Sequence, residues 1–336
     1  MRWFVNRLIL LIFVLWGATT IVFIIMSVVP RNPAIAMAGT TATEEQLEKF
    51  NERWGMNKPV LQRYYEFYLN LFKGDLGTSI RTGRPISTEI KLFFPATFEL
   101  ATFSIIISLI AGILLGVISS LKRNKIIDQI TRFISLIGVS TPSFWMGLVL
   151  LLVFYYFIDF TGPGRVSSDA FIPTKITGFY LLDSLLTWNW AAFWDCLKHI
   201  ILPAISLGFY GIGVVTRMMR SSMLDVLSMD YIKSAKARGF PMKSVIFRHA
   251  LKNSLIPTIT AVGVLYGSYL GGVMIIESIF AWPGLGSFVL TSILKADFPA
   301  IMGTVLVIAF LRSLINLLVD LIYRLLDPRI RFQVEK

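Results

Sequence analysis

The sequence predicts an all-α membrane protein with six transmembrane helices, and two observations support this prediction. Hydrophobic residues make up 55% of the 336 residues and charged residues only 15%, a balance too apolar for an ordinary soluble domain. A helix crosses a bilayer with about 20 mostly apolar residues, and six runs are long enough. They cover approximately residues 8–29, 97–121, 133–158, 201–222, 256–279 and 300–323. Six spans place both termini on the same side of the membrane.

The first apolar run has a rival interpretation as a cleaved signal peptide. Ala36, Met37, Ala38 and Gly39 resemble a small-residue cleavage site. The run from Leu8 to Val29 is longer than the apolar core of a signal peptide and long enough to span the membrane, so we expect it to be retained.

The long loop at 30–96 carries helix signals of its own. Thr43 and Gln46 form a capping-box pattern, while Pro59 opens a second helix that Gly74 ends. This second helix has an apolar stripe that needs a partner surface: Leu61, Tyr64, Tyr65, Tyr68, Leu69 and Phe72. We expect it to pack over the ends of the spans; a docking site for another protein is the alternative.

The remaining spans and the second outer segment give weaker signals. The fourth run contains Gly208, Gly211 and Gly213, which lower helix propensity but also let membrane helices pack closely. The segment 159–200 is broken by glycine and proline and carries three tryptophans suited to the level of the lipid headgroups, Trp188, Trp190 and Trp194. No binding site can be read from it.

The distribution of basic residues predicts the orientation. One set of segments, which includes both termini, holds 18 Lys and Arg residues, and the opposite set holds 13. Nine of the 13 lie in the long loop at 30–96, where the positive-inside rule has little weight. The first set is therefore expected to be cytoplasmic.

The densest basic stretch, 230–257, covers most of the expected cytoplasmic segment, 223–255. Asp230 can cap a helix that ends at Gly239, and Pro241 can start a second helix to about Lys252. Apolar residues fall on one side of this unit and basic residues elsewhere. The physics leaves open whether the unit lies on anionic lipid or docks a soluble partner. Nucleic acid fits poorly because no stacking aromatic series accompanies the charge.

Several kinds of chemistry are disfavoured. The single Cys196 allows neither an intramolecular disulfide nor a thiol cluster. His199 and His249 fall on opposite sides of the predicted membrane, so they cannot share a metal or a nucleophile. No phosphate-binding loop of the type Gly-x-x-x-x-Gly-Lys-[Ser/Thr] is present. We therefore expect no catalysis by this chain.

Four charged residues lie in or near the spans, where charge is expensive. Glu99, Glu277 and Asp320 are expected at the interface or in structural pairs, and Arg312 is expected to line a path or to pair between helices. Glu99, Glu277 and Arg312 are the candidates for a translocation path.

The basic stretch also carries a family resemblance. Residues 231–239 and 248–253 resemble the cytoplasmic coupling-helix motif of ABC importer permeases in the dipeptide and oligopeptide (peptide/nickel) branch, specifically the first-permease (B-type) subunit. Further matches occur in order along nearly the whole chain, at 29–33, 74–79, 82–85, 95–97, 141–145, 202–204, 282–286 and 326–329. Two departures from the usual pattern occur. In the basic stretch, the wider superfamily has Glu-Ala-Ala and later Ile-x-Leu-Pro where this chain has Lys233-Ser234-Ala235 and His249-Ala250-Leu251-Lys252. After the first span, Gly-Asp-Pro is usual where this chain has Arg31-Asn32-Pro33.

The resemblance implies the type I ABC importer permease fold and a non-catalytic subunit in the plasma (inner) membrane. It implies a second homologous permease, two cytoplasmic ATPases that use ATP and magnesium, and an extracytoplasmic binding protein, with no cofactor bound by this chain. Peptides are the expected substrate, and oligosaccharides or nickel chelates are the alternatives; a stand-alone channel would not need a coupling helix. The residues implied at the ATPase contact are Tyr231, Ala235, Lys236, Arg238, Gly239, Phe240, Pro241, Arg248 and His249.

Overall fold

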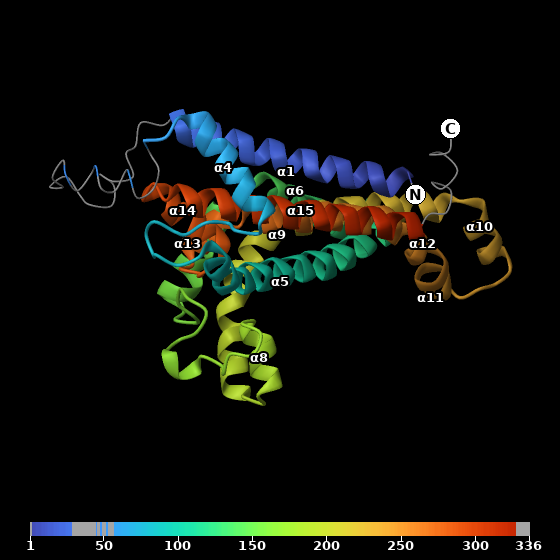
Figure 1. Ribbon diagram of the computed structural model, residues 1–336. Coiled ribbons are helices and arrows are strands. Elements are labelled where there is room, and N and C mark those ends of the chain that lie inside the picture. Colours follow the sequence, from blue (N-terminus) through green and yellow to red (C-terminus); the bar gives the residue numbers. More distant parts are fainter. Residues whose placement is uncertain (1, 29–44, 46–47, 49–51, 53–56, 327–336) are drawn as a thin grey trace. The chain divides into compact units, whose positions relative to one another are not determined.

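The computed structural model describes residues 2–28, 45, 48, 52 and 57–326 (Figure 1). Within these ranges every regular element is a helix, and the only strand-like pairing is an isolated bridge between Thr78 and Pro85. The predicted all-α class is confirmed. The candidate cleavage site at 36–39, the Thr43–Gln46 capping box, and the motifs at 29–33 and 327–329 lie outside the described residues.

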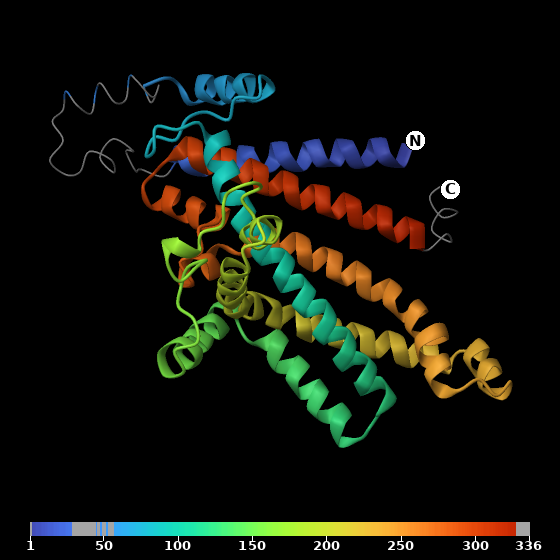
Figure 2. The same ribbon diagram turned by 90° about the horizontal axis from the view of Figure 1, so that it is seen from below.

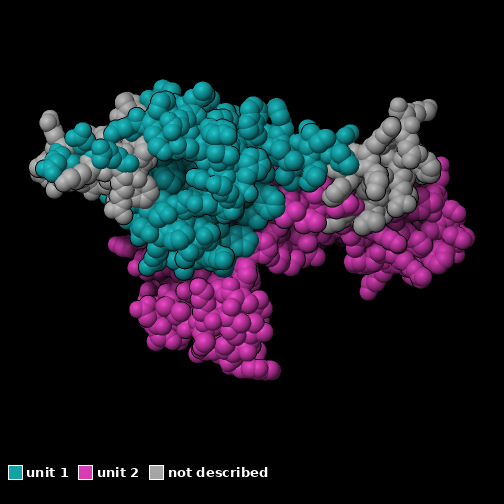
Figure 3. Space-filling model, viewed as in Figure 1, with its two compact units in different colours: residues 1–97, 283–311 teal, residues 98–282, 312–336 magenta. Residues whose placement is uncertain are grey.

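The chain divides into two compact units (Figure 3). Unit 1 comprises residues 1–97 and 283–311, and unit 2 comprises residues 98–282 and 312–336.

In the described part of the chain, five helices are long and apolar enough to cross a membrane. They are α1 (Arg2–Val28), α5 (Ile86–Leu121), α9 (Trp190–Ser228), the run that ends in α12 (Leu251–Gly272), and α15 (Phe298–Leu326). A bent pair, α6 (Ile126–Ser140) with α7 (Ser143–Leu150) and the π-helix η1 (Leu151–Phe157), makes up to six spans if it counts as one.

In unit 1, α4 (Val60–Phe72) lies along α1. The Tyr68 and Tyr64 hydroxyls form hydrogen bonds of 2.7 and 2.8 Å with Thr19 and Thr20 of α1. The Tyr64 ring also meets Phe23 edge-on, with 5.2 Å between the centroids. The tyrosines thus pack against the first span as expected, but against its middle and not over its end, and Leu61 and Phe72 remain 81% and 86% exposed.

A second contact in unit 1 joins the loop before α5 to the corner between α14 (Leu285–Leu294) and α15. The buried carboxylate of Asp297 accepts hydrogen bonds from the Ser79 hydroxyl at 2.5 Å and from the Ile80 amide at 3.0 Å. The Arg81 amide adds a third at 3.2 Å. A buried carboxylate that accepts several bonds fixes the loop firmly.

Unit 2 is built around α9, which packs against α6, α7, α8 (Tyr180–Leu186) and α12. The three glycines of α9 do not interrupt it. A methyl group at Gly208 would lie 2.9 Å from the Ser104 oxygen of α5, and one at Gly213 only 2.5 Å from the Ser135 oxygen of α6; at Gly211 it would collide with the Tyr269 hydroxyl of α12. The glycines therefore serve close helix packing.

The chain turns back from α5 into α6 (Figure 2). The buried carboxylate of Asp128 fixes this turn to α9. Arg220 of α9 binds Asp128 through two hydrogen bonds, from Nε at 2.7 Å and from Nη2 at 2.8 Å. The Ser119 hydroxyl and the Asn124 amide also donate to Asp128. These four donor groups come from three residues, and the Asp128 side chain that they surround has no exposed surface.

The third predicted span is not one straight helix. The sequence predicts a continuous run over 133–158, but α6 ends at Ser140 and α7 leaves at a bend of 105°. Pro142 explains the break, because proline disfavours the helical conformation of the residue before it, and Thr141 is extended with ψ 123°. The fifth predicted span, 256–279, is likewise divided into α12 and the short α13 (Met274–Ile279).

The second outer segment contains more structure than its composition indicates. It includes the short 3-10 helix η2 (Asp169–Phe171) and α8, ahead of the start of α9. Burial alone raises the pKa of Asp183, but hydrogen bonds from Thr177 and from the Gly178 and Ile176 amides outweigh it and leave the pKa below its ordinary value. This carboxylate therefore holds the loop at 176–183 in its ionised form.

Candidate functional site

The basic stretch forms a helical hairpin at the end of α9, which we call the coupling hairpin (residues 230–253). It consists of α10 (Asp230–Ala237), a turn, and a second helix that begins with α11 (Met242–Ser244). The π-helix η3 (Val245–Ala250) then leads directly into α12. Two expectations need correction here. Met229 is the N-cap and Asp230 is the first helical residue, and the second helix does not end at Lys252.

A compact apolar core lies beneath the coupling hairpin. Ile232 and Ala235 of α10 meet Val245 and Ile246 of η3, as the sequence pattern predicts. The same core includes Met219, Met223 and Val226 of α9 together with Ala250. Because these side chains are buried among themselves, the hairpin and the ends of α9 and α12 can move as one body.

The turn of the coupling hairpin is a Schellman motif. The Gly239 amide donates to the Lys236 oxygen at 3.0 Å and the Phe240 amide to the Ala235 oxygen at 3.3 Å. Gly239 has φ +79°, in the left-handed region that side chains with a Cβ disfavour. No atom lies within 4 Å of a methyl group placed on Gly239, so the turn faces open space.

The outer face of the coupling hairpin is basic and aromatic. Arg238 lies over the Phe240 ring, 5.3 Å from its centroid, and Phe240 meets His249 edge-on at 5.7 Å. Asn253 donates to the Tyr231 hydroxyl at 2.7 Å, which links α10 to α12. The exposed side chains on this face are Tyr231, Lys233, Lys236, Arg238, Phe240, Met242, Lys243, Phe247 and Arg248.

The structure brings the sequence-predicted coupling residues together with one difference in role. Ala235 is 1% exposed and belongs to the core, so it supports the hairpin without reaching a partner. Sequence reasoning did not single out Phe247 and Met242, which are 64% and 56% exposed and stand next to the exposed Arg248 and Lys243 in the chain. The sequence did contain a signal for these two residues, because both are large and apolar but fall outside the apolar side of the second helix.

Glu99 is committed to a buried ion pair. Its Oε2 lies 2.6 Å from Arg165 Nη2, each side chain is 6% exposed, and the Leu181 amide donates to Oε1 at 2.8 Å. Arg165 also lies over the Tyr180 ring at 3.5 Å. The expectation of a structural pair is confirmed for Glu99. The pair connects the second outer segment, which contains Arg165, to α5, which contains Glu99.

The other charged residues of the spans differ in exposure. Glu277 has no exposed surface, and Asp320 is half-buried. Arg312 is exposed, with its stem beside Gly267 of α12. Of the three path candidates, only Arg312 therefore presents its side chain at the surface of unit 2.

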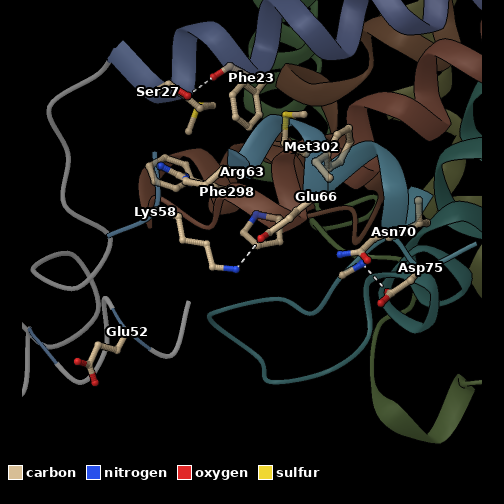
Figure 4. A pocket seen from close by; sticks show the side chains of 15 residues that line it. Phe23, Ser27, Glu52, Lys58, Arg63, Glu66, Asn70, Asp75, Phe298 and Met302 are labelled. Carbon is tan, nitrogen blue, oxygen red and sulfur yellow. Dashed lines mark hydrogen bonds and ion pairs between the residues drawn. The ribbon is translucent and has the colours of Figure 1, made fainter. Parts of the chain in front are cut away.

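Unit 1 has a pocket of about 360 Å³ with charges of both signs (Figure 4). Lys58 Nζ lies 2.7 Å from Glu66 Oε1, which lowers the pKa of Glu66, and burial lowers the pKa of Arg63 beside them. Phe23 and Met302 supply apolar walls. Among the residues that the structure describes, no group of three or more His, Cys, Asp or Glu side chains is arranged to hold a metal.

Comparisons with known proteins match nearly the whole chain. Residues 112–332 match the family described as "Binding-protein-dependent transport system inner membrane component", and residues 1–101 match its N-terminal counterpart. The "Probable D,D-dipeptide transport system permease protein DdpB" of Escherichia coli K12 is 44% identical over 321 residues, covering 95% of this chain and 94% of that protein. The "Dipeptide transport system permease protein DppB" of Alkalihalophilus pseudofirmus is 41% identical, covering 97% and 98%. The "Oligopeptide transport system permease protein AppB" of Bacillus subtilis is 36% identical, covering 98% of each.

Proposed function

The chain belongs to the family of binding-protein-dependent transport system inner membrane components, and on that premise we propose that it is the permease subunit of an ATP-driven importer of peptides. The relatives named as dipeptide and oligopeptide permeases support this substrate class. The chain is a multi-pass membrane component rather than a catalyst. Oligosaccharides and nickel chelates are the alternative substrates.

The proposed machine contains four further parts. A second homologous permease completes the path, two cytoplasmic ATPases bind and hydrolyse ATP with magnesium, and an extracytoplasmic binding protein delivers the peptide. No cofactor is assigned to this chain. Both termini are proposed to be cytoplasmic, because the segments on their side carry 18 Lys and Arg residues, mostly in short loops.

The coupling hairpin is the observation that carries the mechanism. Its apolar side is already buried in this chain, so its exposed basic and aromatic face is available to an ATPase subunit. Closure of the ATPase dimer displaces the hairpin, and the shared core passes the displacement to α9 and α12 as a rigid-body motion. The residues assigned to this contact are those that the sequence predicted, with Ala235 acting from beneath. Arg312 is the one predicted path residue that we retain.

The proposal is tested by comparing charge reversals on two cytoplasmic surfaces. Arg248→Glu changes the coupling hairpin, and Lys125→Glu changes the exposed turn between α5 and α6 as a matched control. Uptake of labelled dialanine is measured in cells that lack the native copy, and copurification of the ATPases is measured from detergent extracts. We expect Arg248→Glu to lower both more than tenfold and Lys125→Glu to leave them unchanged.

Two outcomes would contradict the proposal. If both variants transport and copurify normally, the hairpin does not contact an ATPase. If the tagged chain is recovered alone and still passes solute in liposomes, the chain is a stand-alone channel and the basic face lies on lipid. If cellobiose or nickel competes for uptake and neither a dipeptide nor a hexapeptide does, the chain is still an importer subunit, but its substrate is not a peptide.

A further inference from the structure

The break between α6 and α7 opens onto a cavity of about 410 Å³ in unit 2. Three parts of the fold line it: the break itself, the middle of α9, and the last two turns of α12. The lining residues are Val139, Ser140, Thr141, Pro142, Ser143, Leu207, Tyr210, Ser268 and Tyr269. The volume lies within the range of about 300–1,000 Å³ that small-molecule sites occupy.

Two independent lengths place this cavity within the thickness of the membrane. Thr141 lies eight residues inside the expected cytoplasmic start of the third span at 133, which is about 12 Å along a helix in a hydrocarbon layer of about 30 Å. Leu207 lies six residues inside the expected outer start of the fourth span, about 9 Å from the other surface. Both estimates put the cavity inside the hydrocarbon layer, away from either surface.

Several polar groups around the cavity form no hydrogen bond within the described part of the chain. These are the hydroxyls of Thr141, Ser143 and Tyr210, and no side chain caps the N-terminus of α7. Tyr269, by contrast, shares a 3.3 Å contact with Ser108. Unsatisfied backbone and hydroxyl groups facing hydrocarbon cost several kcal/mol each, so irregular backbone at this depth occurs where it lines water or is covered by protein.

We propose that this cavity is a binding site on the translocation path, where hydroxyl groups bind the backbone of a transported peptide. The inference rests on the proposed function as a peptide permease. Serine, threonine and tyrosine hydroxyls donate and accept, as the N–H and C=O groups of a peptide require. No charged side chain lines the cavity, so binding there is independent of the charge of the peptide's side chains. Because all peptides have the same backbone, a site that binds the backbone suits a transporter of peptides with many different sequences.

The first test measures access of water to the cavity in the assembled transporter in proteoliposomes. The single Cys196, 3% exposed, is replaced by alanine, and Ser143→Cys introduces a thiol in the cavity. Leu148→Cys, 51% exposed on the same half-helix and outside the cavity, is the control. A charged, membrane-impermeant thiol reagent reacts only with thiols in water, because the thiolate is the reactive form. We expect modification of Ser143→Cys at least tenfold faster, slowed severalfold by dialanine with the binding protein and ATP, and unaffected by cellobiose.

The second test removes single hydroxyls without changing shape. We expect Thr141→Val and Tyr210→Phe to raise the KM for dialanine uptake threefold or more at normal protein levels. Thr260→Val is the matched control, because the Thr260 hydroxyl already binds the Ile256 oxygen of its own helix at 3.2 Å and lies outside the cavity. The increase is expected to be the same for dipeptides with acidic, basic and neutral side chains.

Each contrary result overturns the proposal. A Ser143→Cys thiol that stays unreactive means that lipid or the second permease covers the cavity. A reactive thiol that dialanine does not protect means that the cavity holds water but no peptide. If the Cys196→Ala parent imports cellobiose and no dialanine, the proposed substrate is wrong. If cellobiose then also protects the Ser143→Cys thiol, the cavity is a binding site for a different solute, and the proposal that it binds peptide is refuted.

Discussion

Replacing Gly239 separates the stability of the coupling hairpin from its contact with a partner. Any L residue at φ +79° costs about 1–2 kcal/mol relative to glycine, and asparagine tolerates this region better than alanine. Because no atom lies within 4 Å of the position where a Cβ would stand, a long side chain adds no clash within the chain. We therefore expect Gly239→Ala and Gly239→Arg to lower the free energy of unfolding equally, by about 1–2 kcal/mol, and Gly239→Asn to lower it less.

Function is expected to separate the same variants. Thermal unfolding in detergent measures stability, while dialanine uptake and stimulation of ATP hydrolysis by the loaded binding protein measure coupling. Gly239→Asn and Gly239→Ala are expected to retain most uptake, and Gly239→Arg to insert normally but to abolish it, because its side chain occupies the space that the ATPase approaches. Equal uptake by the alanine and arginine variants would refute the contact. A melting temperature for Gly239→Arg far below that of Gly239→Ala would place the damage inside the chain.

Three further predictions concern buried carboxylates. Glu99→Gln leaves Arg165 buried without its counter-ion and is expected to cost about 3–5 kcal/mol, whereas adding Arg165→Met is expected to recover a substantial part; equal melting temperatures for the single and double variants would contradict this. Asp297→Ala removes the acceptor of three loop hydrogen bonds and is expected to speed hydrogen exchange of the Ile80 and Arg81 amides at least tenfold, while Asp75→Ala, an exposed control whose carboxylate accepts from the Gly77 amide, leaves those two amides unchanged. Asp183 has a folded-state pKa below its unfolded value of about 3.9, so its stabilisation is present above pH 4 and is lost as the pH falls through the folded value. Wild type and Asp183→Asn should therefore differ in melting temperature at pH 7, and the difference should shrink as the pH falls below about 3.9; a constant difference from pH 7 into this acidic range would exclude ionisation as the cause.

The helical elements follow from the sequence because their signals are local. Glycine after α10 and proline before α11 mark the turn of the coupling hairpin, and the buried and exposed residues of the hairpin follow a helical period. The bend at Pro142 was missed because the apolar run continues on both sides of it. Proline in a membrane helix is tolerated in some contexts and breaks the helix in others, depending on what satisfies the freed backbone groups.

The pairing of charged residues did not follow from the sequence. Arg165 and Glu99 are 66 positions apart, and Arg220 and Asp128 are 92 apart. Neither Arg165 nor Asp128 carries a local signal of burial. Partners at such separations are set by how the helices pack, and only coordinates identify them.

The sequence by itself determined that this chain is a multi-span helical membrane protein, and its ordered motifs identified the permease family, because apolar length, charge placement and motif order are properties of the chain read in one dimension. Only the tertiary structure decided that Ala235 lies beneath the coupling surface, that Glu99 is bound to Arg165, and that the hydroxyls of the α6–α7 break face a common cavity with Tyr210. Each of these depends on side chains from different helices meeting in space. The free energy of such a contact is gained only once packing has brought the helices together, so no local pattern records it.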